Sequence, residues 1–225
     1  MSRQDENAIR SDNLPDLSWR PAMVVVFIIG VTSLVELVLI AADNGLIGTT
    51  RWRGLAYQYG AFWAGLLDNW RPNYRAQPWV MFLTYPFLHS GLYHMLGNMI
   101  VLYLIGRILV PRVGQPGFAV LYIVSGIGGG LGFALLNDGV QPMVGASGAL
   151  FGLIGAWKWQ DWFSYSRNGY GRRRLVVDVV GLILLNLVLW VVQDGRLAWE
   201  AHLGGFLTGW LAATLMVARH DSDTI

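Results

Sequence analysis

The 225-residue chain contains no cysteine and few charged side chains. Without cysteine it has no disulfide framework, no thiol nucleophile and no thiolate metal site. Charged residues make up only 13% of the chain, and the formal net charge is +2. This balance lacks the strongly basic surface that nucleic-acid binding requires, so no nucleic-acid partner is expected. The His-Glu-x-x-His pattern of zinc proteases is also absent, and the sequence implies neither a metal nor another cofactor.

Apolar residues are abundant instead. They make up 54% of the chain, and the mean hydropathy is +0.44. This is too apolar for a soluble domain of this length. The 28 glycines suit close packing of helices in lipid, and the 11 tryptophans suit the two membrane interfaces. The composition therefore predicts an integral membrane protein.

Long apolar runs predict an all-α membrane protein built as a bundle of six transmembrane helices. The first run lacks the cleavage pattern of a signal peptide and is expected to be retained, with Glu36 facing the bundle or a water-filled cavity. In the long first loop, the aromatic segment 55–67 is too short to span and is predicted to lie as a helix in the interface. The predicted spans are 22–42, 86–110, 118–136, 147–162, 176–192 and 201–218, with tails at 1–21 and 219–225.

Positive charge is distributed unevenly between the loops. The loop after span three has no Lys or Arg, and the loop after span five has Arg196 alone. By the positive-inside rule, both termini are expected in the cytoplasm and Ser147 toward the outer, periplasmic side. The absence of a transit peptide and the short tails favour a bacterial inner membrane. The positive residues after spans two and four are Arg107, Arg112, Lys158, Arg167 and Arg172 to Arg174.

The stretch from Met143 to Ala156 is rich in small residues at helical spacing. Gly148 and Gly152 are four residues apart, and such a stripe lets another backbone approach closely. Ser147 begins the apolar run, so its hydroxyl is expected at a helix N-terminus. One interpretation is an N-cap or a small packing residue. The other is a nucleophile whose oxyanion is stabilised by the helix N-terminus.

Span six begins with a second polar residue, His202, followed on one helix face by Gly205 and Gly209. This small face can meet the small face of span four. Both spans begin on the outer side, so Ser147 and His202 are predicted at similar depth and within hydrogen-bonding reach. A serine beside a histidine is the arrangement of a nucleophile and its base. Because the base must be neutral, activity is expected to fall in acid.

The start of span two carries three polar residues, His89, His94 and Asn98. His94 and Asn98 are four apart and share a helix face. They could be an interfacial histidine and a helix–helix hydrogen bond, but polar groups within a span are usually functional. Side chains of this kind also line oxyanion sites. His89 lies five residues before His94, which is poor spacing for a shared metal.

Three motifs together resemble the rhomboid family of intramembrane serine proteases. The resemblance covers roughly residues 22–218 and implies one six-helix catalytic domain with a cavity open to the outside. It also implies that the substrates are membrane-spanning helices of other proteins, cut near their outer ends. The motifs are Gly145-Ala-Ser147-Gly148, Ala201-His202-Leu-Gly-Gly205 with Gly209, and His89, His94 and Asn98 in that order.

The resemblance also implies a role for each motif residue. Ser147 would be the nucleophile and His202 the general base and acid, without the acidic third member of the usual triad. His94 and Asn98, with the backbone N–H of Ser147, would hold the oxyanion. The family often has a tyrosine stacking on the catalytic histidine, and here that position is Phe151.

One further departure concerns the first loop. The family usually has a Trp-Arg pair shortly before the first histidine of span two, whereas here Trp79 is followed by Val80. A Trp-Arg pair occurs earlier, at Trp52 and Arg53. The departure leaves open how the first loop is anchored.

Two other functions are compatible with parts of the sequence. Glu36, His94 and Asn98 could form a polar relay in a transporter or channel, although no inverted repeat with matching broken helices is found. A non-catalytic protein that holds membrane-protein clients would also need a polar cavity in a bundle. Labelling of Ser147 by a fluorophosphonate, lost in His202→Ala, would favour a protease.

Overall fold

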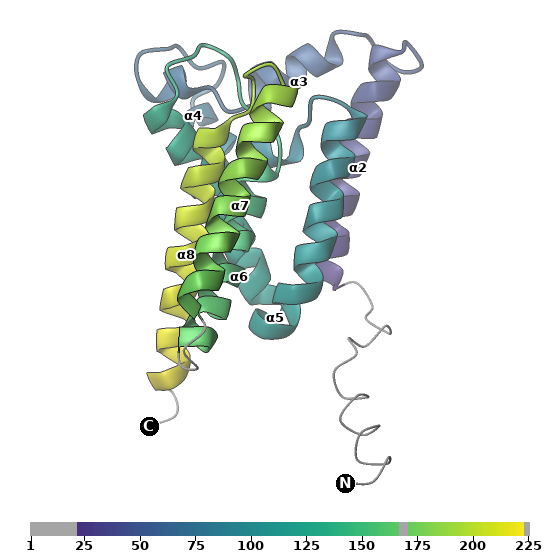
Figure 1. Ribbon diagram of the computed structural model, residues 1–225. Helices are drawn as coiled ribbons and strands as arrows, with labels where there is room; N and C mark the ends of the chain where they lie inside the picture. The colour runs from purple at the N-terminus through teal and green to yellow at the C-terminus, as the bar shows by residue number, and fades with distance from the viewer. Residues whose placement is uncertain (1–21, 167–170, 223–225) are drawn as a thin grey trace, which may run out of the picture.

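The structure is a computed structural model that describes residues 22–166 and 171–222 (Figure 1). In those residues every regular element is a helix, apart from one isolated β-bridge between Phe62 and Met143. The predicted tail at 1–21, residues 223–225 of the tail at 219–225, and Arg167 lie outside the described residues. The elements are α2 (Met23–Asp43), α3 (Trp52–Gly60), η1 (Ala64–Leu67), α4 (Gln77–Thr84), η2 (Tyr85–Phe87), α5 (Leu92–Leu136), α6 (Ser147–Ser166), α7 (Gly171–Val192) and α8 (Trp199–Ser222).

The longest element, α5, crosses the bundle twice. Its 45 residues would make a straight helix of about 67 Å, more than twice the thickness of a bilayer core. The helix doubles back at Gly114, whose φ of 70° and ψ of 169° are non-helical. Pro111 and Pro116 flank this turn, and glycine is the residue that adopts a positive φ without strain. The two halves of α5 thus serve as consecutive spans.

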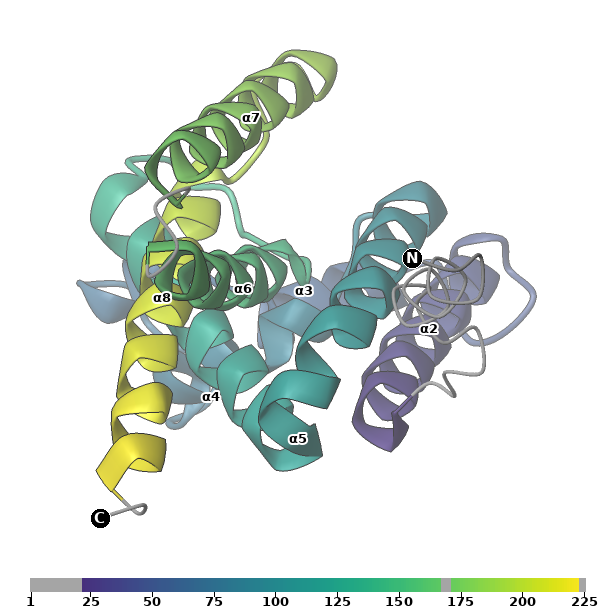
Figure 2. The same cartoon turned by 60° about the horizontal axis from the view of Figure 1, so that its bottom comes forward.

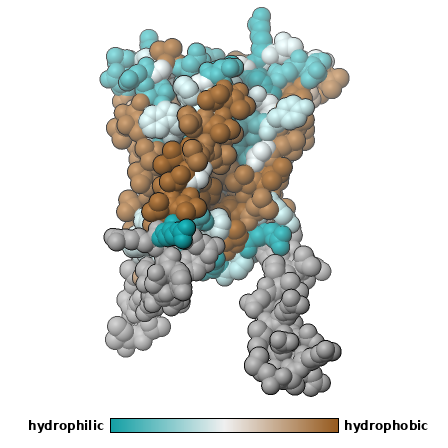
Figure 3. All heavy atoms as spheres, viewed as in Figure 1, coloured by the Kyte–Doolittle hydropathy of each residue, from teal (hydrophilic) through white to brown (hydrophobic). Residues whose placement is uncertain are grey.

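The surface has the polarity of a membrane protein. Figure 3 shows a broad apolar band around the middle of the molecule, with polar residues at the top and more at the lower end. Three helical segments of the described residues are long and apolar enough to cross a bilayer by length and composition. They are α2, α5 and residues Leu175–Val192 of α7, with hydropathies of 2.7, 1.9 and 2.7. The fold is therefore an all-α membrane bundle.

The first loop folds into short helices at one end of the bundle. The predicted interfacial helix over 55–67 corresponds to α3 and η1, which are separated by a break around Ala61. The following helix α4 was not predicted. The second span was predicted from Pro86, but α5 begins at Leu92 because η2 and the positive-φ residue Gly91 come first. These segments lie above the bundle, where they reach the loops between the spans (Figure 1).

Helices α5, α6 and α8 pack against one another at the centre (Figure 2). The glycine stripes of α6 and α8 meet directly: a Cβ at Gly205 would overlap the carbonyl oxygen of Gly148. A Cβ at Gly209 would overlap the carbonyl oxygen of Gly152 in the same way. Lipid gives no hydrophobic drive for helix association, so this backbone contact supplies van der Waals packing that larger residues would prevent.

Helix α7 packs differently. It lies against α6 and leans away from the rest of the bundle (Figure 2). None of its residues from Leu175 to Val192 is buried. One ion pair ties it to α6, with 2.8 Å between the Nζ of Lys158 and the Oδ2 of Asp178. Lipid therefore covers most of α7.

Candidate active site

The loop before Ser147 is held by the first-loop segments. Phe62 and Met143 exchange two backbone hydrogen bonds of 2.9 Å. The N–H of Gly145 donates to the carbonyl of Tyr85 at 3.0 Å, and the N–H of Ala146 donates to Nε2 of His89 at 3.4 Å. These bonds fix the entry of the chain into α6, which begins at Ser147.

Ser147 lines a cavity of about 960 Å³. Ser147 is half-buried, and the space that it lines is large enough to admit water. The walls come from the start of α5, the loop before α6 and the connection from α7 to α8, and they include Ser90, His94, Met143, Trp190 and Trp199.

His202 is buried against α6, with 3% of its surface exposed. Its ring stacks on Phe151 with 4.1 Å between ring centroids and 8° between ring planes. Phe151 comes four residues after Ser147 in α6, so both residues lie on the same face of this helix. The imidazole of His202 therefore packs against the helix face that includes Ser147. Its Nδ1 lies 2.6 Å from Oδ1 of Asn186, while its buried Nε2 has no hydrogen-bond partner among the described residues.

His94 and Asn98 lie together at the start of α5. The Nδ2 of Asn98 donates to the backbone carbonyl of His94 at 2.9 Å, and Nδ1 of His94 lies 3.0 Å from Oγ of Ser90. A Cβ at Gly145 would lie 2.9 Å from Nε2 of His94, and Gly145 has a φ of +121°. Nε2 of His94 therefore faces the backbone two residues before Ser147, which only a glycine lets come so close.

His89 is fully buried in the loop between η2 and α5. Burial and the nearby His94 lower the pKa of His89 to about 3, so its ring stays neutral and Nε2 accepts from Ala146. The two rings are 4.9 Å apart, edge to face. No group of three or more His, Asp or Glu in the described part of the chain could hold a metal ion. His89 thus supports the loop before Ser147.

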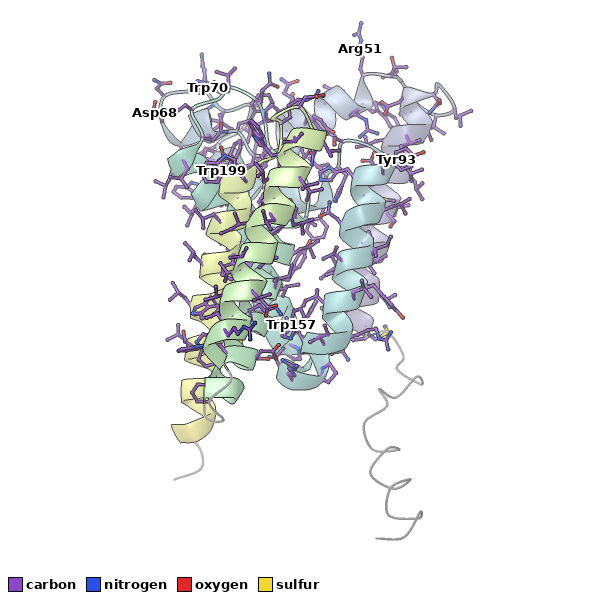
Figure 4. All side chains as sticks on the ribbon, viewed as in Figure 1. Arg51, Asp68, Trp70, Tyr93, Trp157 and Trp199 are labelled. Atoms are coloured by element: carbon purple, nitrogen blue, oxygen red, sulfur yellow. The ribbon has the colours of Figure 1, made fainter. Side chains whose placement is uncertain are left out.

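The two histidines of the site lie toward the same end of the bundle. Tyr93, which precedes His94, and Trp199, three residues before His202, both lie near the upper end in Figure 4. Trp157 of α6 lies near the opposite end. The structure therefore gathers the predicted site residues at the end of the bundle that carries the first loop.

The Rhomboid domain matches residues 75–219 of this chain. The chain belongs to the rhomboid family. This match includes α5, α6, nearly all of α8 and each of the three motifs.

This rhomboid is similar to several curated proteins. It is 34% identical to RHOMBOID-like protein 1 of Arabidopsis thaliana over 159 residues, which are 69% of this chain and 39% of that protein. It is 27% identical over 143 residues to YdcA of Bacillus subtilis (strain 168), whose name assigns it provisionally to the rhomboid proteases. That match covers 64% of this chain and 70% of YdcA. The chain spans about two fifths of the plant relative.

Not every relative is named as active. The chain is 35% identical over 118 residues to Inactive RHOMBOID-like protein 8 of Arabidopsis thaliana, which covers 51% of this chain and 30% of that protein. Family membership therefore supports an intramembrane protease of the rhomboid type, but it assigns catalysis to no particular residue.

The first loop of this rhomboid is anchored by Arg53. Its Nη1 and Nη2 lie 3.1 and 2.9 Å from the two carboxylate oxygens of Glu36, and its Nε lies 2.6 Å from Asp43. Nη1 also donates to the carbonyl of His89 at 2.9 Å, as does the hydroxyl of Tyr57 at 2.7 Å. Burial raises the pKa of Tyr57, so this phenol stays a donor. The anchor that the sequence left open thus joins α2, α3 and the His89 loop.

The sequence left the role of Arg53 open and gave no role to Asn186. Trp79, which is followed by Val80, is 74% exposed, whereas Arg53 of the earlier Trp52-Arg53 pair donates to the carbonyl of His89. Asn186 was passed over within the predicted span 176–192, although a polar side chain in an apolar span is itself a signal of function. Its partner His202 is 16 residues away, at the start of another helix.

Proposed function

We propose that this rhomboid is a serine endopeptidase that hydrolyses peptide bonds in or near the transmembrane helices of membrane-protein substrates. Ser147 is the nucleophile, and His202 is the general base and acid. The observation that carries the proposal is the buried, unpartnered Nε2 of His202, on a ring that lies against the face of α6 headed by Ser147. The predicted hydrogen bond between Ser147 and His202 is not formed in this structure, since Nε2 has no partner among the described residues. An unprotonated Nε2 that comes within reach of the Ser147 hydroxyl would accept its proton.

The chemistry follows from this placement. His202 takes the proton of Ser147 as Oγ attacks the scissile carbonyl carbon, and it returns that proton to the leaving amine. Water from the cavity then hydrolyses the acyl-enzyme with His202 again as the base. The cavity supplies this water to a reaction that lipid alone would exclude.

We assign the oxyanion to His94, Asn98 and the backbone N–H of Ser147. An amide nitrogen has two hydrogens, and Asn98 uses one of them on the carbonyl of His94, which leaves one for the oxyanion. Nε2 of His94 faces the loop before Ser147. Removing one such donor costs about 2.7–4 kcal/mol in the barrier, so Asn98→Ala should slow turnover without unfolding the bundle.

The proposed catalytic domain extends over 22–218. The chain is an integral membrane protein, and we place it in a bacterial inner membrane with both termini cytoplasmic. The site then opens toward the periplasm, where the outer ends of substrate helices lie. The distribution of Lys and Arg among the shorter loops supports this orientation.

A fluorophosphonate probe and a single-span substrate test the proposal on the full chain in liposomes. We expect the probe to label Ser147, with no labelling and no cleavage in Ser147→Ala, and loss of both in His202→Ala. Gln141→Ala is the control, because Gln141 lines the same cavity but belongs to none of the proposed catalytic groups, so its loss should leave Ser147 labelled. Cleavage by purified Ser147→Ala would refute the proposal.

One alternative has an observation in its favour. One relative in the comparison, RHOMBOID-like protein 8 of Arabidopsis thaliana, is named as inactive. A protein of that kind would bind membrane-protein clients through the same cavity and release no product. Binding of a single-span helix without cleavage, together with no probe labelling, would favour it. Flux of a small solute independent of Ser147 would favour a transporter or channel.

A further inference from the structure

Asn186 projects from α7 to the imidazole of His202. The Oδ1 of Asn186 lies 2.6 Å from Nδ1 of His202. Its Nδ2 donates to the carbonyl of Leu182 at 2.9 Å, one turn earlier on the same helix. The amide nitrogen is therefore committed to the backbone, and the oxygen is the atom that meets the ring.

This orientation of the amide decides the tautomer of His202. A carbonyl oxygen only accepts, so Nδ1 must carry the proton in this hydrogen bond. Nε2 is then the unprotonated nitrogen, and it is the buried nitrogen without a partner. A base that takes a proton from Ser147 needs this tautomer.

Two contacts together fix the ring. The stacked Phe151 sets the plane of the imidazole, with 8° between the two rings. Stacking alone allows the ring to turn within that plane, and the hydrogen bond from Nδ1 to Asn186 fixes the direction of Nε2.

The packing of α7 against the bundle does not require an asparagine at position 186. Asn186 is half-buried in a helix with no buried residue in the span from Leu175 to Val192. An asparagine facing the bundle from within lipid is costly unless it is hydrogen-bonded. Leucine would suit the packing of this face better, since Leu182 and Leu189 share it one turn before and after.

We propose that Asn186 is a positioning residue for His202, so that the site works as a Ser147–His202–Asn186 triad with a neutral third member. The proposal rests on the proposed function. Asn186 does not touch the substrate. It holds the imidazole in the tautomer and direction that let Nε2 serve Ser147, as an orienting third group does in other hydrolases.

The test compares Asn186→Leu, which loses the acceptor, with Asn186→Asp, which keeps it. Cleavage of a single-span substrate in liposomes gives kcat and KM, and thermal unfolding checks the fold. We expect Asn186→Leu to lower kcat about tenfold, the effect of one hydrogen bond, with KM within about twofold. Asn186→Asp should keep more of kcat than Asn186→Leu. Leu189→Ala, on the same face of α7, is the matched control and should keep the wild-type kcat.

A purely structural role predicts the opposite order, because leucine suits lipid and a carboxylate does not. Folded Asn186→Leu with the wild-type kcat, or an Asp variant no better than the Leu variant, would overturn the proposal. If the Asp variant does not fold, Asn186→Ser replaces it, since it is neutral and keeps an acceptor oxygen. Wild-type enzyme without Ser147-dependent cleavage would instead refute the proposed function, so the two failures are distinct.

Discussion

At the scale of single residues, Gly145 shows how closely the backbone must approach the site. It has a φ of +121°, and any Cβ there would lie 2.7 Å from Cε1 of His94. A side chain would therefore be strained and would push the ring of His94 away, at a cost of about 1–3 kcal/mol.

We expect Gly145→Ala to lower kcat for a single-span substrate while the protein still folds. Gly97→Ala is the matched control, because Gly97 lies in α5 near His94 and a Cβ there meets nothing within 4 Å. A Gly145→Ala enzyme with normal kcat would show that His94 does not need its present position.

Glu36 is the residue in α2 whose role the sequence left open beyond its facing the bundle or a water-filled cavity. It is fully buried and pairs with Arg53, which is 19% exposed. Glu36→Gln should lower the free energy of unfolding by about 2–3 kcal/mol, somewhat less than for a fully buried pair because water still reaches the guanidinium. Unfolding by a denaturing detergent measures the change.

The control for Glu36 is an exposed pair. Arg196 and Asp194 are more than 80% exposed, with 3.4 Å between their charged atoms, so Arg196→Gln should leave stability unchanged. Equal stabilities of wild type and Glu36→Gln would mean that Arg53 anchors the first loop without its partner in α2.

The sequence predicts those candidate site residues that stand at the start of a helix with regularly spaced glycines. Ser147 and His202 each head a glycine stripe, and the two stripes do meet in the structure. Arg53 and Asn186 carry no such local pattern. Their partners lie 36 and 16 residues away, and only the packed bundle shows which polar groups meet. Such pairs need tertiary structure, because neither partner marks the other in the sequence.

At the scale of elements, the contact between α6 and α8 depends on the absence of side chains. A Cβ at Gly205 would overlap the backbone of Gly148, and a helix has no way to move aside without separating the two stripes. We expect Gly205→Ala to lower the unfolding temperature, with a loss of about 1–3 kcal/mol or more.

Gly181→Ala is the control for this element, because Gly181 lies in the lipid-covered helix α7 and a Cβ there meets nothing within 4 Å. The Gly181→Ala protein should unfold at the wild-type temperature or slightly above it, because alanine favours a helix more than glycine does. If Gly205→Ala unfolds at the wild-type temperature, the close approach of the two backbones is not needed for the bundle.

The elements that the sequence predicted well are those with long apolar runs. α2 begins and ends within one residue of the predicted span 22–42, since the run is continuous. The first-loop helix α4 was missed because its eight residues carry no clear period and directly precede η2. The sequence predicts the second span from residue 86, whereas Pro86 lies in the short 3-10 helix η2 and α5 begins at Leu92.

At the scale of the whole molecule, the proposed orientation predicts which ends face the cytoplasm. The natural chain has no cysteine, so single cysteines report their side without further changes. Asp68 lies at the upper end in Figure 4. Arg112 comes two residues before Gly114, where α5 doubles back, and Figure 1 shows this turn of α5 at the lower end. A membrane-impermeant maleimide applied from the periplasmic side should label Asp68→Cys and leave Arg112→Cys unlabelled.

Both variants should react fully once the membrane is dissolved, which controls for buried positions. Labelling of Arg112→Cys alone in intact membranes would invert the orientation and place the site on the cytoplasmic side. The positive-inside rule reached this expectation from loop charges only, since the Arg residues of the long first loop carry less weight.

Helix α7 has few contacts with the rest of the bundle, so the hydrogen bond between Asn186 and His202 depends on how α7 is tilted in the membrane. None of the residues from Leu175 to Val192 is buried, so few protein contacts oppose a tilt of this helix when its apolar length and the bilayer thickness do not match. Tilting the helix would draw the amide away from the imidazole and release the ring. On the proposed role of Asn186, we therefore expect turnover to depend on bilayer thickness and to peak in lipids whose hydrocarbon core matches α7.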